Sequence, residues 1–544
     1  MIWLAATLLL PLAMLFACLS QTLRYRMSNW LSVAAVPGLG AALFAPEASL
    51  DLPPFLLRLR LSLDLPSAIL LGVAALLWIA AGVYAAAWLR DDPRRGRIAE
   101  WWLLTLTGSL GVFMAADLVS FYLLFSMVSL AAYGLIIEGR AADAQKVGLI
   151  YVALAVFGEA LLLMAFVMLA QSGSASGPGD GLLIRDAVAA LAVSPWRNAI
   201  LALIIGGFGV KLGMVPFHVW MPITYRTAPI PAAAALSGAA VKAGAIGLLR
   251  FLPLGLALPD WGNVLTTLGF ISAFYAVLIG VTQTNPRMVL AFSSISQMGV
   301  IAAVFGMGLG APNADLALIV AFYAAHHTLV KGGLFLGVGL APLSGPRRTW
   351  LVLVPAAIMG LGLAGLPLTG GALAKLAIKP VLGDGWAGTL GILSSLATAL
   401  LMTHFLFRLA ALPEAVAPNA LHGRLRWSWL MIAAASVVVP WALYLMVMSG
   451  SVAYALSPAS LWASLWPVVV GATLAAGLRP WGSRLPRVPD GDIVMLVAAR
   501  VARVAGRTAA ALEWLDGALR QWPVAVLSLL AISAILAALM LVRV

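Results

Sequence analysis

The lysines of this sequence are few and lie where a lysine is costly. Only six occur among 544 residues, and Lys146 alone lies in a polar loop. The other five interrupt hydrophobic segments long enough to cross a bilayer: Lys211, Lys242, Lys331, Lys375 and Lys379. An ammonium group in hydrocarbon is expensive, so such residues usually mark ion pathways or proton relays. The pattern therefore predicts a transport function.

One carboxylate shares this environment. Glu159 lies deep in the segment YVALAVFGEALLLMAF, far from either flanking loop. Lys211, in the next hydrophobic segment, is its natural partner, and each charge would then control the proton affinity of the other. The alternative is a neutral glutamic acid bonded to a backbone carbonyl. We expect the pair to be the entry step of a relay.

Two adjacent histidines extend the series. His326 and His327 precede Lys331 in AFYAAHHTLVKGG, and the four-residue spacing places His327 and Lys331 on one helical face. Neutral imidazole both donates and accepts hydrogen bonds, so it can pass a proton onward near neutral pH. With no carboxylate or third histidine close in sequence, we expect no metal site here.

A second set of polar residues could give access to the relay or exit from it. It comprises Asp117, His218, Lys379 and His404. Asp117 begins a hydrophobic segment, where a helix N-cap at the membrane interface is the alternative. His218 follows a break in its segment, and His404 lies inside another; for both, a packed core histidine is the alternative.

The elements that must carry these residues are membrane-spanning helices. The chain is 63% hydrophobic and 10% charged, and apolar runs of one-span length recur throughout, about 16 in all. The predicted spans are 2–20, 28–46, 66–89, 99–115, 117–138, 147–171, 198–221, 230–250, 263–283, 288–308, 315–340, 351–379, 386–411, 427–449, 460–478 and 522–542. The sequence thus predicts an all-α polytopic membrane protein.

Two spans contain helix breakers beside a lysine. GGFGVKLGMVPFHVWMP surrounds Lys211, and GLAGLPLTGGALAK ends at Lys375. Glycine and proline interrupt the helical hydrogen bonds of these spans in mid-membrane. The two spans are five apart and so run in opposite directions. Paired interruptions in inverted halves point to a transport site, and we predict two inverted five-helix repeats, each with one broken helix.

Charge asymmetry sets the predicted orientation. Loops on one side hold most of the basic residues, including Arg24, Arg26, Arg347 and Arg348, and this side is predicted to be cytoplasmic. Both termini would then lie outside, with the first segment retained as a helix. Residues 492–521 predict an amphipathic helix along the cytoplasmic interface; a connector folded over the bundle is the alternative.

Composition excludes several classes of function. The net charge of +13 comes from loop arginines facing anionic lipid, and no soluble basic patch indicates nucleic acid binding. Cys18 is the only cysteine, which excludes a disulfide framework, an iron–sulfur cluster and a cysteine zinc site within this chain. We therefore expect no cofactor and no metal.

Several motifs resemble one family. The family comprises the antiporter-like, proton-conducting subunits shared by respiratory complex I, membrane-bound hydrogenases and Mrp-type cation/proton antiporters. The segment ADLVSFYLLFSMVSLAAY is similar to its fifth helix, and VKLGMVPFHVWMP is similar to its broken seventh helix. APIPAAAALSGAAVKAGAIGLLR, QTNPRMVLAFSSISQMG, YAAHHTLVKGGLFLGVG and GLPLTGGALAK resemble its eighth, tenth, eleventh and twelfth helices. The resemblance covers about 65–410.

The resemblance implies roles for individual lysines. Lys211 would be the mid-membrane lysine, Lys242 the connecting lysine, and Lys331 and Lys375 the central and exit lysines, with His327 matching the histidine ahead of Lys331. The sequence also departs from the family at two positions. Ser126 stands where the family has a glutamate paired with the lysine of the seventh helix, and Asn285 where an aspartate is common. We expect that Glu159, on the next helix, replaces the missing carboxylate.

The expected organisation has five parts: three N-terminal helices at 1–98, the repeats at 99–250 and 251–411, two helices at 412–478, and the lateral helix with its terminal anchor at 479–544. We expect a proton-translocating, non-catalytic subunit of a larger oxidoreductase complex in the bacterial inner membrane. Its partners would be other membrane subunits, including further antiporter-like ones, and lipids. The alternatives are an Mrp-type Na⁺/H⁺ antiporter subunit, a subunit of an inorganic-carbon uptake complex, or a non-pumping scaffold.

Overall fold

The computed structural model describes residues 1–51, 59–175, 182–345, 349–413, 422–481, 488 and 492. The chain divides into two compact units, Met1–Asp490 and Gly491–Val544, and nearly all of the second lies outside the described residues. The predicted amphipathic helix and the terminal anchor at 522–542 fall there. All of the described helices and strands belong to the first unit.

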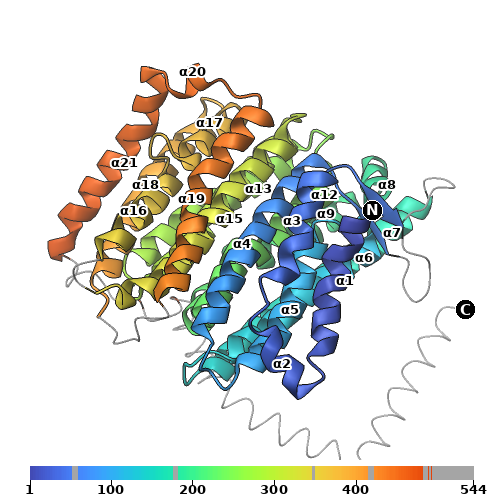
Figure 1. Cartoon of the computed structure of the whole chain (residues 1–544). Helices are drawn as coiled ribbons and strands as arrows, with labels where there is room; N and C mark the ends of the chain where they lie inside the picture. The colour runs from blue at the N-terminus through green and yellow to red at the C-terminus, as the bar shows by residue number, and fades with distance from the viewer. Residues whose placement is uncertain are drawn as a thin grey trace, which may run out of the picture. The chain divides into compact units, whose positions relative to one another are not determined.

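Helices dominate this unit (Figure 1). Its N-terminal part contains α1 (Ile2–Ala17), α2 (Gln21–Met27), η1 (Val33–Ala35), α3 (Val36–Phe44), the antiparallel hairpin β1 (Ser49–Asp51) and β2 (Arg60–Ser62), and α4 (Leu65–Trp88). The next part contains α5 (Arg95–Gly111), α6 (Leu118–Ile137), α7 (Ala144–Ala175), α8 (Ile184–Ala189), η2 (Ala190–Ala192), α9 (Arg197–Leu212), α10 (Trp220–Thr227), α11 (Ile230–Ala235), η3 (Leu236–Ala240) and α12 (Lys242–Phe251).

A further series of helices completes the unit. It contains α13 (Pro259–Gly280), α14 (Pro286–Gly310), α15 (Leu316–Leu340), η4 (Ala341–Leu343), α16 (Trp350–Ala364), α17 (Gly370–Leu382), α18 (Trp386–Ala410), α19 (His422–Met446), α20 (Val452–Ala455), α21 (Pro458–Leu478) and η5 (Arg479–Trp481). Every predicted span from 2–20 to 460–478 overlaps one of these helices or a broken pair of them. Among the described residues, ten helices are long and apolar enough to cross a membrane, so the chain is a polytopic helical membrane protein.

Polar side chains set where several spans begin. The Asp117 carboxylate accepts hydrogen bonds from the backbone N–H groups of Val119 and Ser120 at the start of α6. Asn285 caps α14 in the same way, with Pro286 as the first helical residue. Such caps satisfy donors that the first turn leaves unpaired, an important requirement near hydrocarbon.

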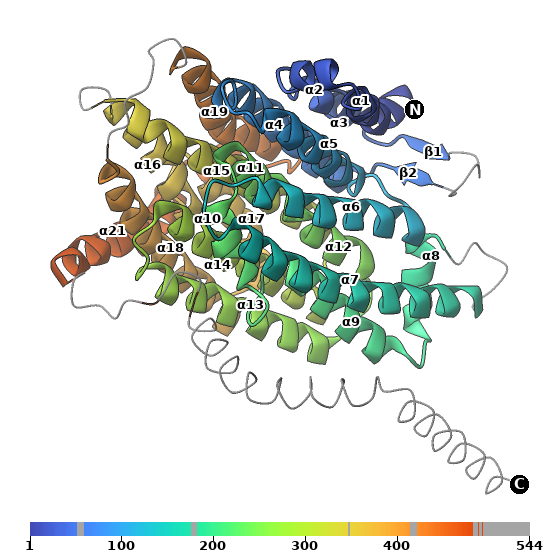
Figure 2. The same cartoon turned by 90° about the horizontal axis from the view of Figure 1, so that it is seen from below.

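Burial separates an inner group of helices from an outer one. The buried share of an 18-residue apolar stretch of each helix is 100% for α14 and 94% for both α15 and the α11–η3–α12 segment, but only 22% for α21. Figure 2 shows α14 surrounded by other helices, and both views show α21 at the edge of the bundle (Figures 1 and 2). Polar groups on the inner helices are therefore shielded from lipid by the rest of the chain.

Both predicted helix breaks are present. α9 ends at Leu212 and is followed by Gly213 with φ 70°; α16 ends at Ala364 and is followed by Gly365 with φ 106°. Glycine adopts this left-handed conformation without a Cβ clash and is common after helix ends. α10 and α17 then resume the two spans. The breaks place backbone polar groups in the interior, beside Lys211 and Lys375.

Candidate functional site: a buried lysine and histidine axis

Lys211 is the penultimate residue of α9, next to the first break. Its Nζ donates a 2.9 Å hydrogen bond to Ser129 Oγ of α6 and lies 5.6 Å from the centre of the Phe125 ring. The C-terminal carbonyl groups of α9 carry partial negative charge, which attracts a cation. The helix end, the hydroxyl and the aromatic face thus provide a polar setting for an ammonium group that is only 8% exposed.

Glu159 approaches the same place from α7. Glu159 is 6% exposed. Its carboxylate faces Ser126 and Ser129 and interacts electrostatically with Lys211. Within the part of the chain that the structure describes, Glu159 and Lys211 form no direct ion pair, and neither Glu159 Oε1 nor Ser126 Oγ has a hydrogen-bond partner. Ser129 is therefore the side chain shared by the two charged groups.

A small cavity lies beside this cluster. It has a volume of about 10 Å³ and is lined by Ser129, Tyr151, Gly158 and Lys211, among others. This is room for about one water molecule, with Ser129, Tyr151 and Lys211 as polar residues in an otherwise mostly apolar lining. Tyr151 donates its hydroxyl to the Ser129 carbonyl at 2.8 Å. The cavity could therefore hold a single water beside the Lys211 ammonium; Glu159 is not among its lining residues.

Lys242 follows an irregular helical turn. η3 is a π-helix, and Lys242 comes two residues after it. Its Nζ donates to the carbonyl of Gly238 at 2.9 Å and lies 3.4 Å from that of Ser237. π-helical turns displace carbonyl groups from the regular ladder and are frequent at functional sites. Here the turn supplies the acceptors for a lysine that is 1% exposed.

The same ammonium group meets a histidine of another helix. Lys242 Nζ lies 2.8 Å from Nδ1 of His327 on α15, a residue with no exposed surface. The Nε2 atom of His327 has no hydrogen-bond partner among the described residues. A proton can therefore be shared at Nδ1 while the other ring nitrogen stays available.

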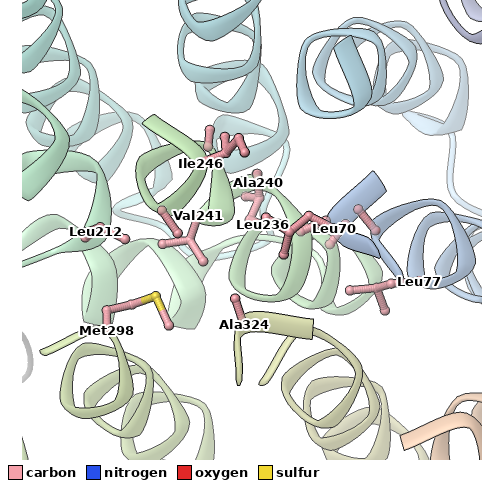
Figure 3. Packing of buried hydrophobic residues seen from close by; sticks show 14 of the residues in the cluster. Leu70, Leu77, Leu212, Leu236, Ala240, Val241, Ile246, Met298 and Ala324 are labelled. Atoms are coloured by element: carbon pink, nitrogen blue, oxygen red, sulfur yellow. The ribbon is translucent and has the colours of Figure 1, made fainter. Parts of the chain in front are cut away.

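Apolar packing fixes this contact. Leu77 of α4 occupies the space that a Cβ would need at both Gly238 of η3 and Gly332 of α15. Figure 3 shows the apolar side chains around the turn: Leu70, Leu77, Leu212, Leu236, Ala240, Val241, Ile246, Met298 and Ala324. The two glycines thus allow α4, η3 and α15 to approach closely, and the packed interior holds Lys242 against His327.

Lys331 lies one turn beyond His327 on α15. Its Nζ donates to the carbonyl of Leu290 on α14 at 3.0 Å, and Ser294 donates to the same carbonyl at 3.1 Å. Ser294 Oγ is in turn 3.0 Å from Ser237 Oγ of η3. The surroundings of Lys242 and Lys331 are therefore joined twice, through His327 and through a pair of serines.

His326 points toward the second break. A Cβ at Gly370 or Gly371 would lie 2.8 Å or 2.9 Å from its ring nitrogens, so the start of α17 packs directly on the imidazole. Neither ring nitrogen has a hydrogen-bond partner among the described residues, and the charge of Lys375 reaches the ring. The adjacent histidines therefore diverge, His327 toward Lys242 and His326 toward α17.

Lys375 lies in the second turn of α17 and turns back toward the break. A Cβ at Gly365 would lie 2.9 Å from Lys375 Cδ. Its Nζ donates a 2.6 Å hydrogen bond to Ser395 Oγ of α18. The ionisable residues thus lie on α9, α12, α15 and α17, a series of helices that runs from one break to the other: Lys211, Lys242, His326, His327, Lys331 and Lys375.

The secondary candidates lie outside this series. Asp117 is the N-cap of α6. His218 is buried with its ring 5.2 Å from that of Tyr275. His404 Nε2 lies 2.8 Å from the Gln283 carbonyl and ties α18 to the turn after α13. Lys379 is exposed, one helical turn after Lys375.

The hydroxyl partners of the lysines are absent from the residues predicted from the sequence. Ser129 and Ser395 hold the first and last lysines, and Ser237 and Ser294 connect the middle ones. Each is a polar residue inside an apolar run, which is the signal that could have identified it. Within the described residues, no group of three or more His, Cys, Asp or Glu side chains could hold a metal ion.

Comparisons with known proteins agree with this architecture. The chain is 30% identical over 302 residues to hydrogenase-4 component B of Escherichia coli (strain K12), which covers 53% of this chain and 44% of that protein. It is 30% identical over 333 residues to NADH-quinone oxidoreductase subunit N 2 of Roseiflexus castenholzii, covering 55% of this chain and 66% of the relative. The match therefore spans 44% and 66% of these two relatives' own length, less than two thirds of each.

Solved structures share the fold. A chain of the Mrp complex from Dietzia sp. DQ12-45-1b superposes with a TM-score of 0.76 at 22% identity, covering 100% of this chain and 63% of that one. A chain of the membrane-bound sulfane sulfur reductase, an archaeal respiratory membrane complex, gives 0.66 at 19% identity, covering 87% and 99%. The family model for "NADH:quinone oxidoreductase/Mrp antiporter, TM" matches residues 115–403, which contain every lysine and histidine of the axis, and the chain belongs to that family.

Proposed function

We propose that this chain translocates protons along the series Glu159–Lys211–Lys242–His327–Lys331–Lys375, with His326 beside its last step. The observation that carries the proposal is the 2.8 Å contact between Lys242 and His327 in a fully buried position. A structural role alone gives no reason to bury six ionisable side chains, because each costs desolvation free energy; the buried ones are Glu159, Lys211, Lys242, His326, His327 and Lys331.

Electrostatic coupling supplies the mechanism. Lys242 interacts electrostatically with Lys331, and both lysines interact electrostatically with His327. Like charges in a low-dielectric interior repel strongly, so a proton arriving at one group favours release from the next. Neutral His327 can accept a proton at Nδ1 from Lys242 and release one at Nε2. At the entry, Glu159 sets whether Lys211 retains its proton.

The element order supports the proposal of two inverted repeats. Each repeat consists of three helices, a broken helix pair and one further helical segment. The first repeat comprises α5, α6, α7, α9–α10 and α11–η3–α12, and the second comprises α13, α14, α15, α16–α17 and α18. In the proposed arrangement, Lys211 precedes its break, near the carbonyl end of α9. Lys375 follows its break, near the amide end of α17. Helix ends carry opposite partial charges, so the two lysines would differ in how readily they keep a proton.

We further propose that the chain works within a multi-subunit complex of the inner membrane, with both termini outside. Its relatives are components and subunits, and the solved neighbours belong to complexes. We propose that the predicted lateral helix at 492–521 helps the complex to assemble. Its deletion should weaken assembly while the rest of the chain still inserts, and normal assembly of the truncated chain would contradict this role. Reporters fused to each terminus would test the orientation.

The function is tested by proton flux. The complex, reconstituted in sealed vesicles with a pH-sensitive dye, should lose most flux in Lys242→Met and Lys331→Met. Full flux in both variants would refute the relay. A second candidate, Na⁺/H⁺ antiport, comes from a relative, Na⁺/H⁺ antiporter subunit A1 of Staphylococcus haemolyticus, 29% identical over 322 residues. Flux that requires Na⁺ would favour it over proton translocation alone.

A further inference from the structure

A groove of about 500 Å³ lies between the C-terminal part of α1 and the N-terminal part of α5. We call it the α1–α5 groove. Apart from Cys18 and Glu100, its lining consists of large apolar side chains: Leu12, Leu15, Phe16, Leu19, Trp101 and Leu104. Its size falls within the range of about 300–1,000 Å³ that small-molecule sites occupy. An apolar lining disfavours water as the occupant, so the groove fits an apolar molecule.

The groove faces outward from the helix bundle. Phe16 and Leu19 are 75% and 72% exposed, and both helices overlap predicted membrane spans. Contacts between membrane helices favour small residues, which let the two backbones approach closely. The lining here is instead made of leucine, phenylalanine and tryptophan. A flexible acyl chain can follow such an uneven surface, whereas a second helix would be held away from it by these side chains.

The groove ends in polar groups at the level of Trp101. Tryptophan is enriched where hydrocarbon gives way to lipid headgroups. The Trp101 ring packs on Gly134 of α6, where a Cβ would overlap it, so its position is fixed. The neighbouring Glu100 carboxylate lies 2.7 Å from Nε of Arg24 on α2, and α2 packs beside the start of α5 (Figure 1). A lipid whose chain fills the groove would therefore bring its headgroup to this ion pair.

Arg24 is held rigidly and still has free donors. Its Nε also donates to the Cys18 carbonyl at 3.0 Å, and a Cβ at Gly96 of α5 would lie 2.8 Å from Arg24 Cδ. Among the described residues, the two terminal guanidinium nitrogens make no hydrogen bond, and the side chain is 33% exposed. A guanidinium can give two parallel hydrogen bonds to one phosphate. Arg24 is thus oriented to bind a phosphate at the end of the groove.

The surrounding charge favours an anion. Arg26, two residues after Arg24 on α2, is exposed, and the Arg95 guanidinium lies 5.2 Å from the centre of the Tyr25 ring. Three arginines therefore accompany one glutamate, which Arg24 already neutralises. Basic clusters of this kind attract the headgroups of anionic lipids.

We propose that the α1–α5 groove binds an anionic glycerophospholipid, with one acyl chain along the groove and the phosphate on the terminal nitrogens of Arg24. The groove precedes residues 115–403, the part of the chain matched by the family model. The inference does not depend on proton translocation. It assigns the N-terminal helices a lipid ligand of their own.

Native mass spectrometry tests the proposal. The complex is reconstituted in vesicles of equal parts phosphatidylcholine, phosphatidylethanolamine and phosphatidylglycerol, and the lipids that stay bound after mild extraction are identified. The original protein should retain phosphatidylglycerol in preference to the other two. Leu15→Trp, which fills the groove, should lose most of this lipid. Leu9→Trp is the matched control: Leu9 is 63% exposed on the same helix and outside the groove, and long helical side chains lean toward the N-terminus, here away from the groove.

A charge variant tests the headgroup separately. Arg24→Gln should reduce the preference for phosphatidylglycerol over phosphatidylcholine roughly fivefold, the factor expected for one arginine at a lipid surface. Arg90→Gln, which removes an exposed positive charge outside the groove, should leave the preference unchanged. Leu104→Trp fills the groove from α5 if Leu15→Trp folds poorly.

Each part of the proposal has its own contrary result. Full retention of phosphatidylglycerol in both Leu15→Trp and Leu104→Trp overturns the groove as the site of the acyl chain. Equal retention of the three lipids by the original protein, or an unchanged preference in Arg24→Gln, overturns recognition of the headgroup by Arg24. A co-purifying subunit that cross-links at Phe16, with no lipid retained, overturns the lipid as the occupant.

Discussion

Lys242 Nζ and His327 Nδ1 lie 2.8 Å apart, joining the turn after the π-helix η3 to the middle of α15. The two residues are 85 positions apart in sequence. The contact depends on Leu77 of α4, which fills the space left by Gly238 and Gly332. A packed apolar junction thus holds the two ionisable groups at hydrogen-bonding distance.

We predict that Lys242→Met and His327→Gln each reduce proton flux by roughly 100-fold, the usual contribution of a positioned proton-transfer group. The double variant should be little worse than either single one, because both remove the same step. Thr328→Val is the matched control: Thr328 neighbours His327 on α15, and among the described residues its hydroxyl bonds only the carbonyl of Ala324 in its own helix. Additive losses in the double variant would show independent roles.

The relocated carboxylate gives the next prediction. Glu159→Gln should reduce flux about as severely as Lys211→Ala, because the pair sets entry to the relay, whereas Ser126→Ala should do little. Ser126→Glu combined with Glu159→Gln should recover part of the flux, since α6 and α7 both face Lys211 through Ser126, Ser129 and Glu159. Near-normal flux in Glu159→Gln, measured in sealed vesicles, would refute the pairing.

The second break should be sensitive to added volume. In Gly371→Ala, the new methyl group would meet the carbonyl of Gly362 and the ring of His326, both held in place. Overpacking of this kind costs about 1–3 kcal/mol, so the melting temperature of the purified complex should fall. Gly360→Ala is the control, because its methyl group would lie 3.2 Å from the flexible end of Met402. Equal melting temperatures for the two variants would contradict the tight junction.

A loop outside the membrane should show a pH dependence of stability. Hydrogen bonds from the Arg94 side chain, with one from Arg140, lower the pKa of Asp92 to about 2 from its ordinary 3.8. A lowered folded-state pKa contributes stability above the unfolded value and loses it as the pH falls from about 4 through 2. Asp92→Asn should therefore destabilise the protein at pH 7, by up to about 2 kcal/mol.

Thermal unfolding at pH 7 and at pH 3 checks this prediction. The difference between the original protein and Asp92→Asn should be largest at pH 7 and shrink at pH 3. Asp91→Asn, at the exposed neighbouring position, should change little at either pH. A difference between the original protein and Asp92→Asn that does not depend on pH would show that the substitution acts through packing and not through the charge of Asp92.

The sequence by itself determined the class of protein, the positions of most helices and the ionisable residues worth testing. Apolar runs of bilayer length identify helices because hydrocarbon forces the backbone to satisfy its own hydrogen bonds. Lys211 and Lys375 stood out because charge is rare in such runs, and the glycines beside them marked both breaks, which the structure contains at Gly213 and Gly365.

Only the tertiary structure decided which groups meet. Nothing in the local sequence pattern shows that Lys242 contacts His327. The pattern also does not show that Lys211 donates a hydrogen bond to Ser129 and forms no direct ion pair with Glu159 among the described residues, or that α21 lines a cavity beside Lys375. Those contacts depend on how helices distant in sequence approach one another. The approach is set by the volumes of side chains such as Leu77 against glycines such as Gly238, a property of the packed interior that the periodicity of single segments does not contain.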